Sequence, residues 1–392
     1  MRGLIYELRR RTPLGWLQLS RKKSRLLVAL LGIAFADILM FMQFGFQQAL
    51  YDSNTSINRA VLADIVLISP LSRNMQNLST FSRRRLFQAY DVPGVKSTQA
   101  LYIGLITWKN PQTRKKVSVQ VMGFNPDELA LNIPGIDSHL EEIRLPDTFI
   151  FDRGSRGDYN EVFSQLEQGK IVTTEIEKRS IRVSGLFTLG ASFGYDGTLI
   201  SSDENFLRIF PKRQVGGINL GLINLEPGYD PKQVAEALKS HLISEDIKVL
   251  TREEFIQLEM EYWKKESPIG FIFGLGAAMG FLVGVALVYQ VLSTDVNAHM
   301  REYATFKAMG YRNSFLLGVI FEEAMILAIL GFIPGFIVPL GLYDLTRNAT
   351  TLPLYMTLNI VFLVLSLTIF MCIISGAIAT RKLRSADPAD MF

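Results

Sequence analysis

The sequence has little cysteine and histidine: one cysteine, Cys372, and three histidines among 392 residues. A single cysteine cannot form a disulfide within the chain, so any domain outside a membrane must be held by its own hydrophobic core. His139, His241 and His299 share no metal-ligand spacing, and Cys372 lies in an apolar stretch. We therefore expect no metal site. No G-x-x-x-x-G-K-[ST] pattern occurs, so we expect no phosphate-binding loop for ATP.

Charge is nearly absent from four long apolar segments, which are 26–46, 268–292, 315–345 and 357–379. Crossing the hydrocarbon core takes about 20 apolar residues, so each segment predicts a transmembrane helix. The third is long for a straight span, and we expect Pro334 and Pro339 to kink it, or the helix to tilt. No A-x-A-like cleavage site follows the first segment, which predicts an uncleaved anchor.

Lysine and arginine are distributed unevenly around these spans. They number eight in residues 1–25, three in 293–314 and three in 380–392, but only one in 346–356. The positive-inside rule then predicts cytoplasmic termini, a cytoplasmic 293–314 loop and a periplasmic domain at 47–267, in a bacterial inner membrane. Segment 48–267 carries 26 basic and 28 acidic residues, so the chain's net charge of +4 lies elsewhere. It reflects topology and attraction to anionic lipid, not nucleic-acid binding.

The long segment 47–267 predicts a mixed α and β domain between the first two spans. Strand-like runs occur at 61–69, 100–109, 115–124, 171–174, 181–189 and 218–225, the second and third forming a hairpin. Helix-start signals are Asp203, Asp230 with Pro231, and Thr251 with Glu254 in capping-box spacing. Residues 47–60 and the helix up to Lys265 are expected to form two helical stalks. The predicted fold class is therefore a four-helix membrane protein with an inserted α+β periplasmic domain.

Polar groups and glycines within the spans are candidates for helix packing or function. Asp37, Glu322 and Glu323 are ionisable groups in apolar surroundings, where such groups face protein or water. For the two glutamates, a position at the membrane interface is at least as good an explanation as a role in proton transfer. Asp37 lies deeper in its span, but a single acid cannot form a proton relay. The second span has three G-x-x-x-G spacings, which favour a packing seam within one chain or across a dimer. They involve Gly270, Gly274, Gly276, Gly280 and Gly284.

Two loops of the periplasmic segment carry short motifs. Residues 190–194 match the G-x-S-x-G pattern of a hydrolase, with Ser192 as the nucleophile. That reading needs a helix after the motif, whereas Tyr195-Asp196-Gly197 indicates another turn, so we favour a glycine-rich loop and expect no catalytic residue. The loop 152–158 is the best candidate for a mobile segment.

The loop between the second and third spans contains the most informative short segment. Residues 301–311 predict a short amphipathic helix ended by Gly310. Such a helix can lie on the bilayer surface or in the groove of a cytoplasmic partner, and physical chemistry alone leaves both open.

This loop resembles the R-E-x-x-x-x-x-A-x-G signature of the FtsX/MacB-like ABC permease family. The matching positions are Arg301, Glu302, Ala308 and Gly310, and Glu323-Ala324 follows in the third span. The ending 387–391 is similar to that family's D-P-x-[DE]-A type, and the one-plus-three arrangement of spans is MacB-like. Within the family, 189–193 and 206–210 look most like the cyanobacterial DevC group, whose permease exports heterocyst glycolipid.

The resemblance implies a homodimeric permease without enzymatic activity, paired with two copies of an ABC ATPase that bind ATP and Mg, so no cofactor is expected on this chain. Only 25 residues precede the first span, so we expect the ATPase on a separate protein. The implied contact residues for the ATPase are Arg301, Glu302, Phe306, Lys307, Met309, Gly310 and Tyr311. ATP-driven motion would reach the periplasmic domain, which would deliver a lipid or glycolipid to a membrane-fusion adaptor and a TolC-like channel.

Three other functions stay open at this point. One is an FtsX-like signal transmitter that activates a cell-wall hydrolase, although its outer domain would be much smaller. Another is a lipoprotein-releasing permease. The last is a membrane-anchored hydrolase that uses Ser192.

Overall fold

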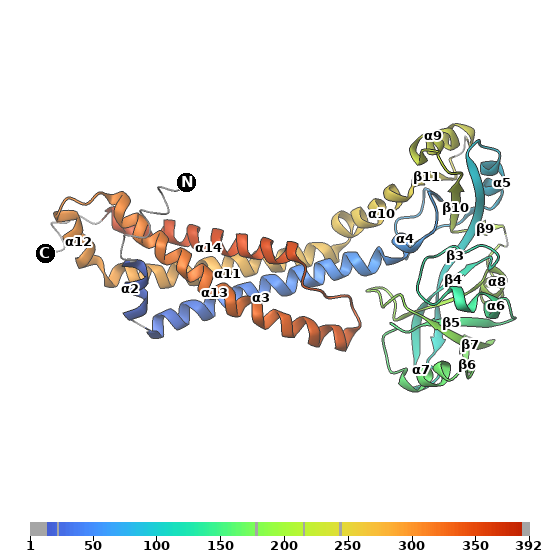
Figure 1. The fold of residues 1–392 in the computed structure, drawn as a ribbon, viewed down its shortest axis with the longest axis horizontal. Helices are drawn as coiled ribbons and strands as arrows, with labels where there is room; N and C mark the ends of the chain where they lie inside the picture. Colours follow the sequence, from blue (N-terminus) through green and yellow to red (C-terminus); the bar gives the residue numbers. More distant parts are fainter. Residues whose placement is uncertain (1–13, 22, 177–178, 215, 243–244, 386–392) are drawn as a thin grey trace. The chain divides into compact units, whose positions relative to one another are not determined.

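The computed structural model describes residues 14–385 apart from 22, 177–178, 215 and 243–244, so the family-like ending at 387–391 lies outside the described residues. The chain divides into two compact units (Figure 1). One, the helix bundle, comprises 1–48, 271–345 and 354–392. The other, the inserted domain, comprises 49–270 together with 346–353.

Four long apolar helices form most of the helix bundle. They are α3 (Lys23–Asn54), α11 (Pro268–Ala298), α13 (Asn313–Thr350) and α14 (Leu358–Ser385). Each is long and apolar enough to cross a membrane, as the sequence predicts, and each is longer than its predicted span. Two short helices, α2 (Leu14–Arg21) and α12 (Met300–Ala308), also belong to it.

Helix α13 runs without a break through Pro334 and Pro339. Its 38 residues measure about 57 Å at 1.5 Å per residue, which exceeds the hydrocarbon core of about 30 Å. The excess explains why the apolar segment looked too long for one span. Its last five residues, 346–350, belong to the inserted domain.

One part of the inserted domain, built from both ends of its sequence, has a β-α-β-β-α-β order. It comprises β1 (Ile65–Ile68), α5 (Arg84–Tyr90), β3 (Val95–Lys109), β10 (Leu220–Leu225), α9 (Pro231–His241) and β11 (Lys248–Thr251). The strands lie in the order β11-β1-β10-β3, all antiparallel, which is a ferredoxin-like arrangement. Residues from α5 and α9, such as Leu86 and Leu238, share one core with Ile65 and Leu67 of β1.

Between β3 and β10 the chain forms a second group of strands. It contains β4 (Lys116–Phe124), β5 (Thr148–Asp152), β6 (Val172–Ile176), β7 (Arg179–Phe187) and β8 (Gly197–Ser202). The order β3-β4-β8-β5-β7-β6 returns to β3, because Trp108 pairs with Ile176. The ladder thus closes on itself. The rings of Trp108, Phe151 and Tyr159 pack in its core, with centroids of the first two 4.7 Å apart.

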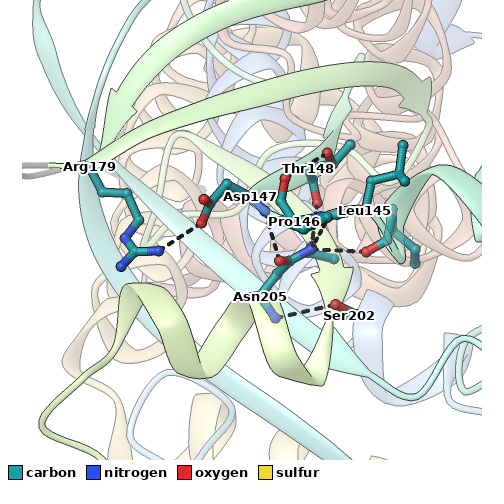
Figure 2. Close-up of polar contacts among 9 residues, drawn as sticks. Leu145, Pro146, Asp147, Thr148, Arg179, Ser202 and Asn205 are labelled. Atoms are coloured by element: carbon teal, nitrogen blue, oxygen red, sulfur yellow. Dashed lines mark hydrogen bonds and ion pairs between the residues drawn. The ribbon is translucent and has the colours of Figure 1, made fainter.

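Short helices cover this second group: α6 (Leu140–Ile143), α7 (Asn160–Glu167) and α8 (Asp203–Ile209). The buried amide of Asn205 joins α8 to the turn before β5 (Figure 2). Its nitrogen donates to the carbonyls of Leu145 and Thr148, and its oxygen accepts from the backbone N–H of Asp147 at 2.9 Å. Asp147 has φ +56°, so these bonds hold a backbone conformation that few residues other than glycine adopt.

Local signals predicted several of these elements correctly. The β3–β4 hairpin, the Asp230 cap of α9 and the Thr251–Glu254 capping box of α10 (Arg252–Glu261) are all present. The predicted cap of α8 is one residue off, because Ser202 and not Asp203 accepts the N–H of Asn205. The stalk after α10 is not a plain α-helix, since a π-helical turn, Tyr262–Glu266, precedes α11. In the other predicted stalk, residues 47–60, the end of α3 is followed by the short helix α4 (Ser56–Ala60).

Candidate functional site

The loop between α11 and α13 is held as a defined helix with a defined end. After α12, Gly310 has φ +90°, a backbone conformation that favours glycine. Its N–H bonds the carbonyl of Lys307, and the N–H of Tyr311 bonds that of Phe306 at 3.1 Å, which closes the helix end. The predicted helix at 301–311 and its glycine end are therefore present.

One face of α12 is anchored on the same chain. Tyr303 and Ala304 are buried, and Tyr303 packs with Val296 of α11 and Leu316 of α13. Phe306 also lies on this face, where its ring meets those of Tyr311 and Phe315 at 5.5 and 6.1 Å between centroids. Phe306, one of the implied ATPase contacts, is half-buried and packs in part against its own chain, and its contact with a partner stays a prediction.

The opposite face of α12 is open. Arg301, Glu302 and Gly310 are exposed, and Met309 has 60% of its surface exposed. Tyr311 is exposed as well, whereas Lys307 is half-buried. An apolar methionine beside an arginine and a glutamate can insert into a groove while the charges align it, which is how amphipathic helices bind partners.

Glu323 lies buried in α13 near the base of this loop. Neither of its carboxylate oxygens has a hydrogen-bond partner among the described residues. Gly15 of α2 packs directly on it, since a Cβ at Gly15 would lie 3.0 Å from Glu323 Cγ. The carboxylate of Asp295 in α11 acts on Glu323 electrostatically, and the backbone carbonyl of Asp295 lies 3.0 Å from His299 Nδ1. Glu322, in contrast, is half-buried.

Asp37 lies at the meeting point of three long helices. Its Oδ1 accepts a hydrogen bond of 2.6 Å from the Thr368 hydroxyl of α14, and its Oδ2 has no partner among the described residues. Gly335 of α13 packs on the same side chain, where a Cβ would be 2.7 Å from Asp37 Cβ. The acid thus faces protein, and it fixes α3 against α13 and α14.

The glycines of α11 divide into two groups. Gly280 and Gly284 lie against α3, where a Cβ would approach Leu39 Cβ to 3.2 Å and Ala36 Cβ to 2.8 Å, and Gly276 faces the Gln43 side chain. These three pack within one chain. Gly274 meets only a Gln47 nitrogen at 3.9 Å, and Gly270 lies on the Trp263 carbonyl, so neither belongs to the same seam.

A second glycine pair, which sequence reasoning overlooked, lies in α13. A Cβ at Gly331 would be 2.7 Å from Ile33 Cβ, and Gly335 contacts Asp37 one turn along α3. The signal was available, because 331 and 335 have the same G-x-x-x-G spacing as the pairs in α11.

In the inserted domain, the last residues of two long helices meet one loop. Asn54 ends α3, and its Oδ1 accepts from the Ser192 hydroxyl at 2.9 Å. Thr350 ends α13, and its carbonyl accepts from Arg156, whose guanidinium also donates to the Ser192 carbonyl at 2.9 Å. We call Asn54, Arg156, Ser192 and Thr350 the polar junction.

The third connection to the membrane, α10, reaches the same region through a neighbouring loop. Gln76 donates to Asn54 Oδ1 at 3.0 Å, and the adjacent Met75 N–H donates to Glu259 of α10 at 2.8 Å. The indole nitrogen of Trp263 donates to the other oxygen of Glu259 at 2.8 Å. Burial raises the pKa of Glu259 to about 7, and these two hydrogen bonds only partly offset that effect.

The loops at 152–158 and 189–196 hold one another in place. The buried Asp152 carboxylate accepts from the backbone N–H groups of Gly154, Leu189 and Gly190 at 2.9–3.0 Å. Burial raises the pKa of Asp152 despite these bonds. The loop 152–158, our best candidate for a mobile segment, is therefore attached to the loop 189–196 by hydrogen bonds at Asp152.

The G-x-S-x-G motif does not form a nucleophile elbow. Strand β8 follows Ser192 in place of the helix that an elbow needs, and the Ser192 hydroxyl donates to Asn54. His139 lies elsewhere, over Gly185 of β7, and His241 ends α9.

Comparison with known families covers the region that contains α12. Residues 274–388 match the family described as FtsX-like permease, C-terminal. The chain carries an FtsX-like permease region. Four described helices are long and apolar enough to cross a membrane, and the candidate ATPase contacts, Arg301 to Tyr311, all lie within the matched region.

Solved structures give weaker likenesses. The periplasmic region of MacB from Actinobacillus actinomycetemcomitans has 12% identity and a TM-score of 0.34, covering 52% of this chain and 93% of that one. The extracellular domain of the ABC-type transporter YknZ from Gram-positive bacteria has 15% identity and a TM-score of 0.33, covering 48% and 99%. A domain of a protein described as a permease from Porphyromonas gingivalis has 14% identity and a TM-score of 0.30, and the match covers 48% of this chain and 89% of that one. No curated protein was found to match the chain.

Proposed function

We propose that this chain is the permease subunit of an ABC-type exporter that converts ATP-driven motion of a separate ATPase into movement of the inserted domain. The carrying observation is the match of 274–388 to FtsX-like permeases, within which α12 presents an open face on an anchored helix. We further propose that the termini and α12 are cytoplasmic and that the inserted domain is periplasmic, on the basis of the lysine and arginine distribution.

The ATPase contact is assigned to the open face of α12. Met309 and Tyr311 supply the apolar surface, and Arg301 and Glu302 set the register by charge. The anchored face, through Tyr303 and its neighbours, passes force to α11 and α13. A helix held on one side by its own chain moves as a body when a partner pushes the other side.

The route from membrane to inserted domain is assigned to the polar junction. A shift of α3 or α13 along its axis displaces Asn54 or Thr350, and both residues are tied to the loop 189–196. That loop links β7 to β8, so it can pass the shift to two strands of the closed ladder.

The cargo and the other partners follow from the resemblance of the sequence to the DevC group. We propose a lipid or glycolipid as cargo, a membrane-fusion adaptor and a TolC-like channel as periplasmic partners, and a homodimer as the working unit. Co-purification of the tagged chain, with mass spectrometry of bound proteins and lipids, tests this part. A cell-wall hydrolase in place of an adaptor, with no enriched lipid, would favour the signal-transmitter alternative.

The coupling role has a sharper test. Met309→Asp places a charge at the proposed contact, and we expect the permease's stimulation of its ATPase to fall about tenfold, the cost of losing a central interface anchor. Leu71→Asp is the matched control, because Leu71 is also an exposed apolar residue but lies in the inserted domain. Phe306→Asp is not a clean probe, since it disrupts the packing of α12 itself. Equal stimulation by the wild type and the Met309 variant would refute the contact.

A further inference from the structure

An open groove lies between the first turns of α3 and the last turns of α11. Its volume is about 290 Å³. Most of its lining is apolar, with polar groups at one end; the residues that matter here are Arg25, Val28, Ala29, Leu287, Gln290 and Val291. All of them belong to the helix bundle.

The two helices touch at small residues next to the groove. Gly32 lies on Leu287, where a Cβ would be 3.4 Å from Leu287 Cβ, and Gly280 and Gly284 continue this close contact. Nearer the helix ends larger side chains replace glycine, and Val28 keeps 62% of its surface exposed. An apolar side of this kind accepts a hydrocarbon chain.

Arg25 supplies a positive charge at the groove. Its Nη1 is buried and has no hydrogen-bond partner among the described residues. A buried guanidinium nitrogen without an acceptor is unfavourable, and an anion in the groove would supply the missing acceptor. The planar guanidinium fork suits the oxygens of a phosphate group.

The depth of Arg25 in the bilayer matches that of a headgroup. It directly precedes Leu26, the first residue of the apolar span, and Gln290 and Thr294 lie where α11 leaves its apolar stretch. Basic side chains at the end of a span lie at the level of lipid phosphates, and anionic lipids of the cytoplasmic leaflet attract them.

We infer that this groove binds one anionic phospholipid, with its phosphate on Arg25 and one acyl chain along Val28, Ala29, Leu287 and Val291. The exposed amide of Gln290 provides a second donor for the headgroup. The lipid joins α3 to α11 at the end from which the coupling helix α12 departs. The assignment rests on the groove and the arginine, and it holds whatever the exported cargo is.

The test uses the purified full chain, delipidated and titrated with phosphatidylglycerol or phosphatidylcholine, with bound lipid counted by native mass spectrometry. We expect one tightly bound phosphatidylglycerol per chain and about tenfold weaker binding of it by Arg25→Gln, the loss of one charge-assisted contact. Lys23→Gln is the matched control, because it removes the same charge from an exposed residue outside the groove. We expect its affinity to change by less than about twofold.

A second variant separates the groove from the charge. Val28→Phe fills the apolar side and keeps the arginine, so it should also weaken phosphatidylglycerol binding. Equal affinity for both lipids, or no effect of Arg25→Gln, would overturn the proposal. Competition by millimolar inorganic phosphate would reassign the site to a soluble anion. A change in dimer fraction without a change in bound lipid would assign the groove to a second copy of the chain.

Discussion

Among single residues, Glu259 links the fold of the inserted domain to pH. It is buried on α10, and it accepts hydrogen bonds from Met75 and Trp263. Burial raises the pKa of its carboxyl from 4.5 to about 7. An acid whose pKa is higher in the folded chain contributes stability that is complete below pH 4.5 and is lost as the pH rises through 7.

We predict that the fluorescence of Trp263 changes with a midpoint near pH 7, and that the folded state loses up to about 3 kcal/mol between pH 4.5 and 7. Glu259→Gln should abolish the fluorescence transition and flatten the stability profile, because glutamine does not ionise. Fluorescence titration and thermal melting of the purified chain measure both effects. Glu253→Gln, an exposed acid on the same helix, should leave the transition in place. The same midpoint in the Glu259 variant would contradict the assignment.

At the scale of elements, close contacts at glycines hold the long helices together. Gly280 and Gly284 bring α11 to α3, and Gly331 and Gly335 bring α13 to the same helix. Helix α3 is therefore the central element of the helix bundle. Without a hydrophobic driving force between helices in lipid, such close backbone approach is what stabilises their packing.

Gly331→Ala should lower the melting temperature of the purified chain in detergent, because the added Cβ would be 2.7 Å from Ile33 Cβ and Cγ2, which cannot move away freely. The expected loss is about 1–3 kcal/mol, the usual effect of overpacking. Gly341→Ala lies on the same helix with nothing within 4 Å, so its stability should be unchanged or slightly higher. If both variants melt like the wild type, α13 does not pack on α3 at this position.

At the scale of the whole molecule, the function that we propose requires helix movement to reach the inserted domain. Arg156→Leu removes the bonds to Thr350 and Ser192. We predict that export falls at least about tenfold while ATPase stimulation stays near the wild-type value, since α12 is untouched. Arg153→Leu is the control, because Arg153 is an exposed neighbour paired with Glu167. Equal loss of both activities in the Arg156 variant would point to general misfolding instead.

The orientation of the whole chain in the membrane is also testable. In a Cys372→Ser background, an impermeant thiol reagent should label Lys115→Cys in spheroplasts and Met309→Cys only after lysis. Both positions are exposed, whereas the turn residue Asn110 is only 2% exposed and would react poorly. Labelling of position 309 but not 115 in intact spheroplasts would reverse the predicted topology.

Strands were harder to predict than membrane helices, and β5 and β8 show why. Both are buried along their whole length, so neither alternates apolar with polar residues. Strand β8 carries Thr198, Ser201 and Ser202, and it lies between a parallel and an antiparallel neighbour. Its polar side chains resemble a turn in the sequence, and only pairing with β4 and β5 makes it a strand.

The sequence by itself determined the features that depend on neighbouring residues. A spanning helix satisfies its own backbone hydrogen bonds, so four apolar stretches sufficed to predict four helices. The hairpin at 110–115, the capping box and the helix end at Gly310 depend on residues only a few positions apart.

Tertiary structure alone decided the contacts between distant residues. Asp37 meets Thr368 across 331 positions, Ser192 meets Asn54 across 138, and β6 returns to β3 to close the ladder. It also decided that Phe306 packs on its own chain and that Arg25 Nη1 lies in a groove without a hydrogen-bond partner among the described residues. These outcomes depend on which helices and strands pack together. The local sequence pattern permits many such arrangements, and the burial of apolar side chains selects one of them.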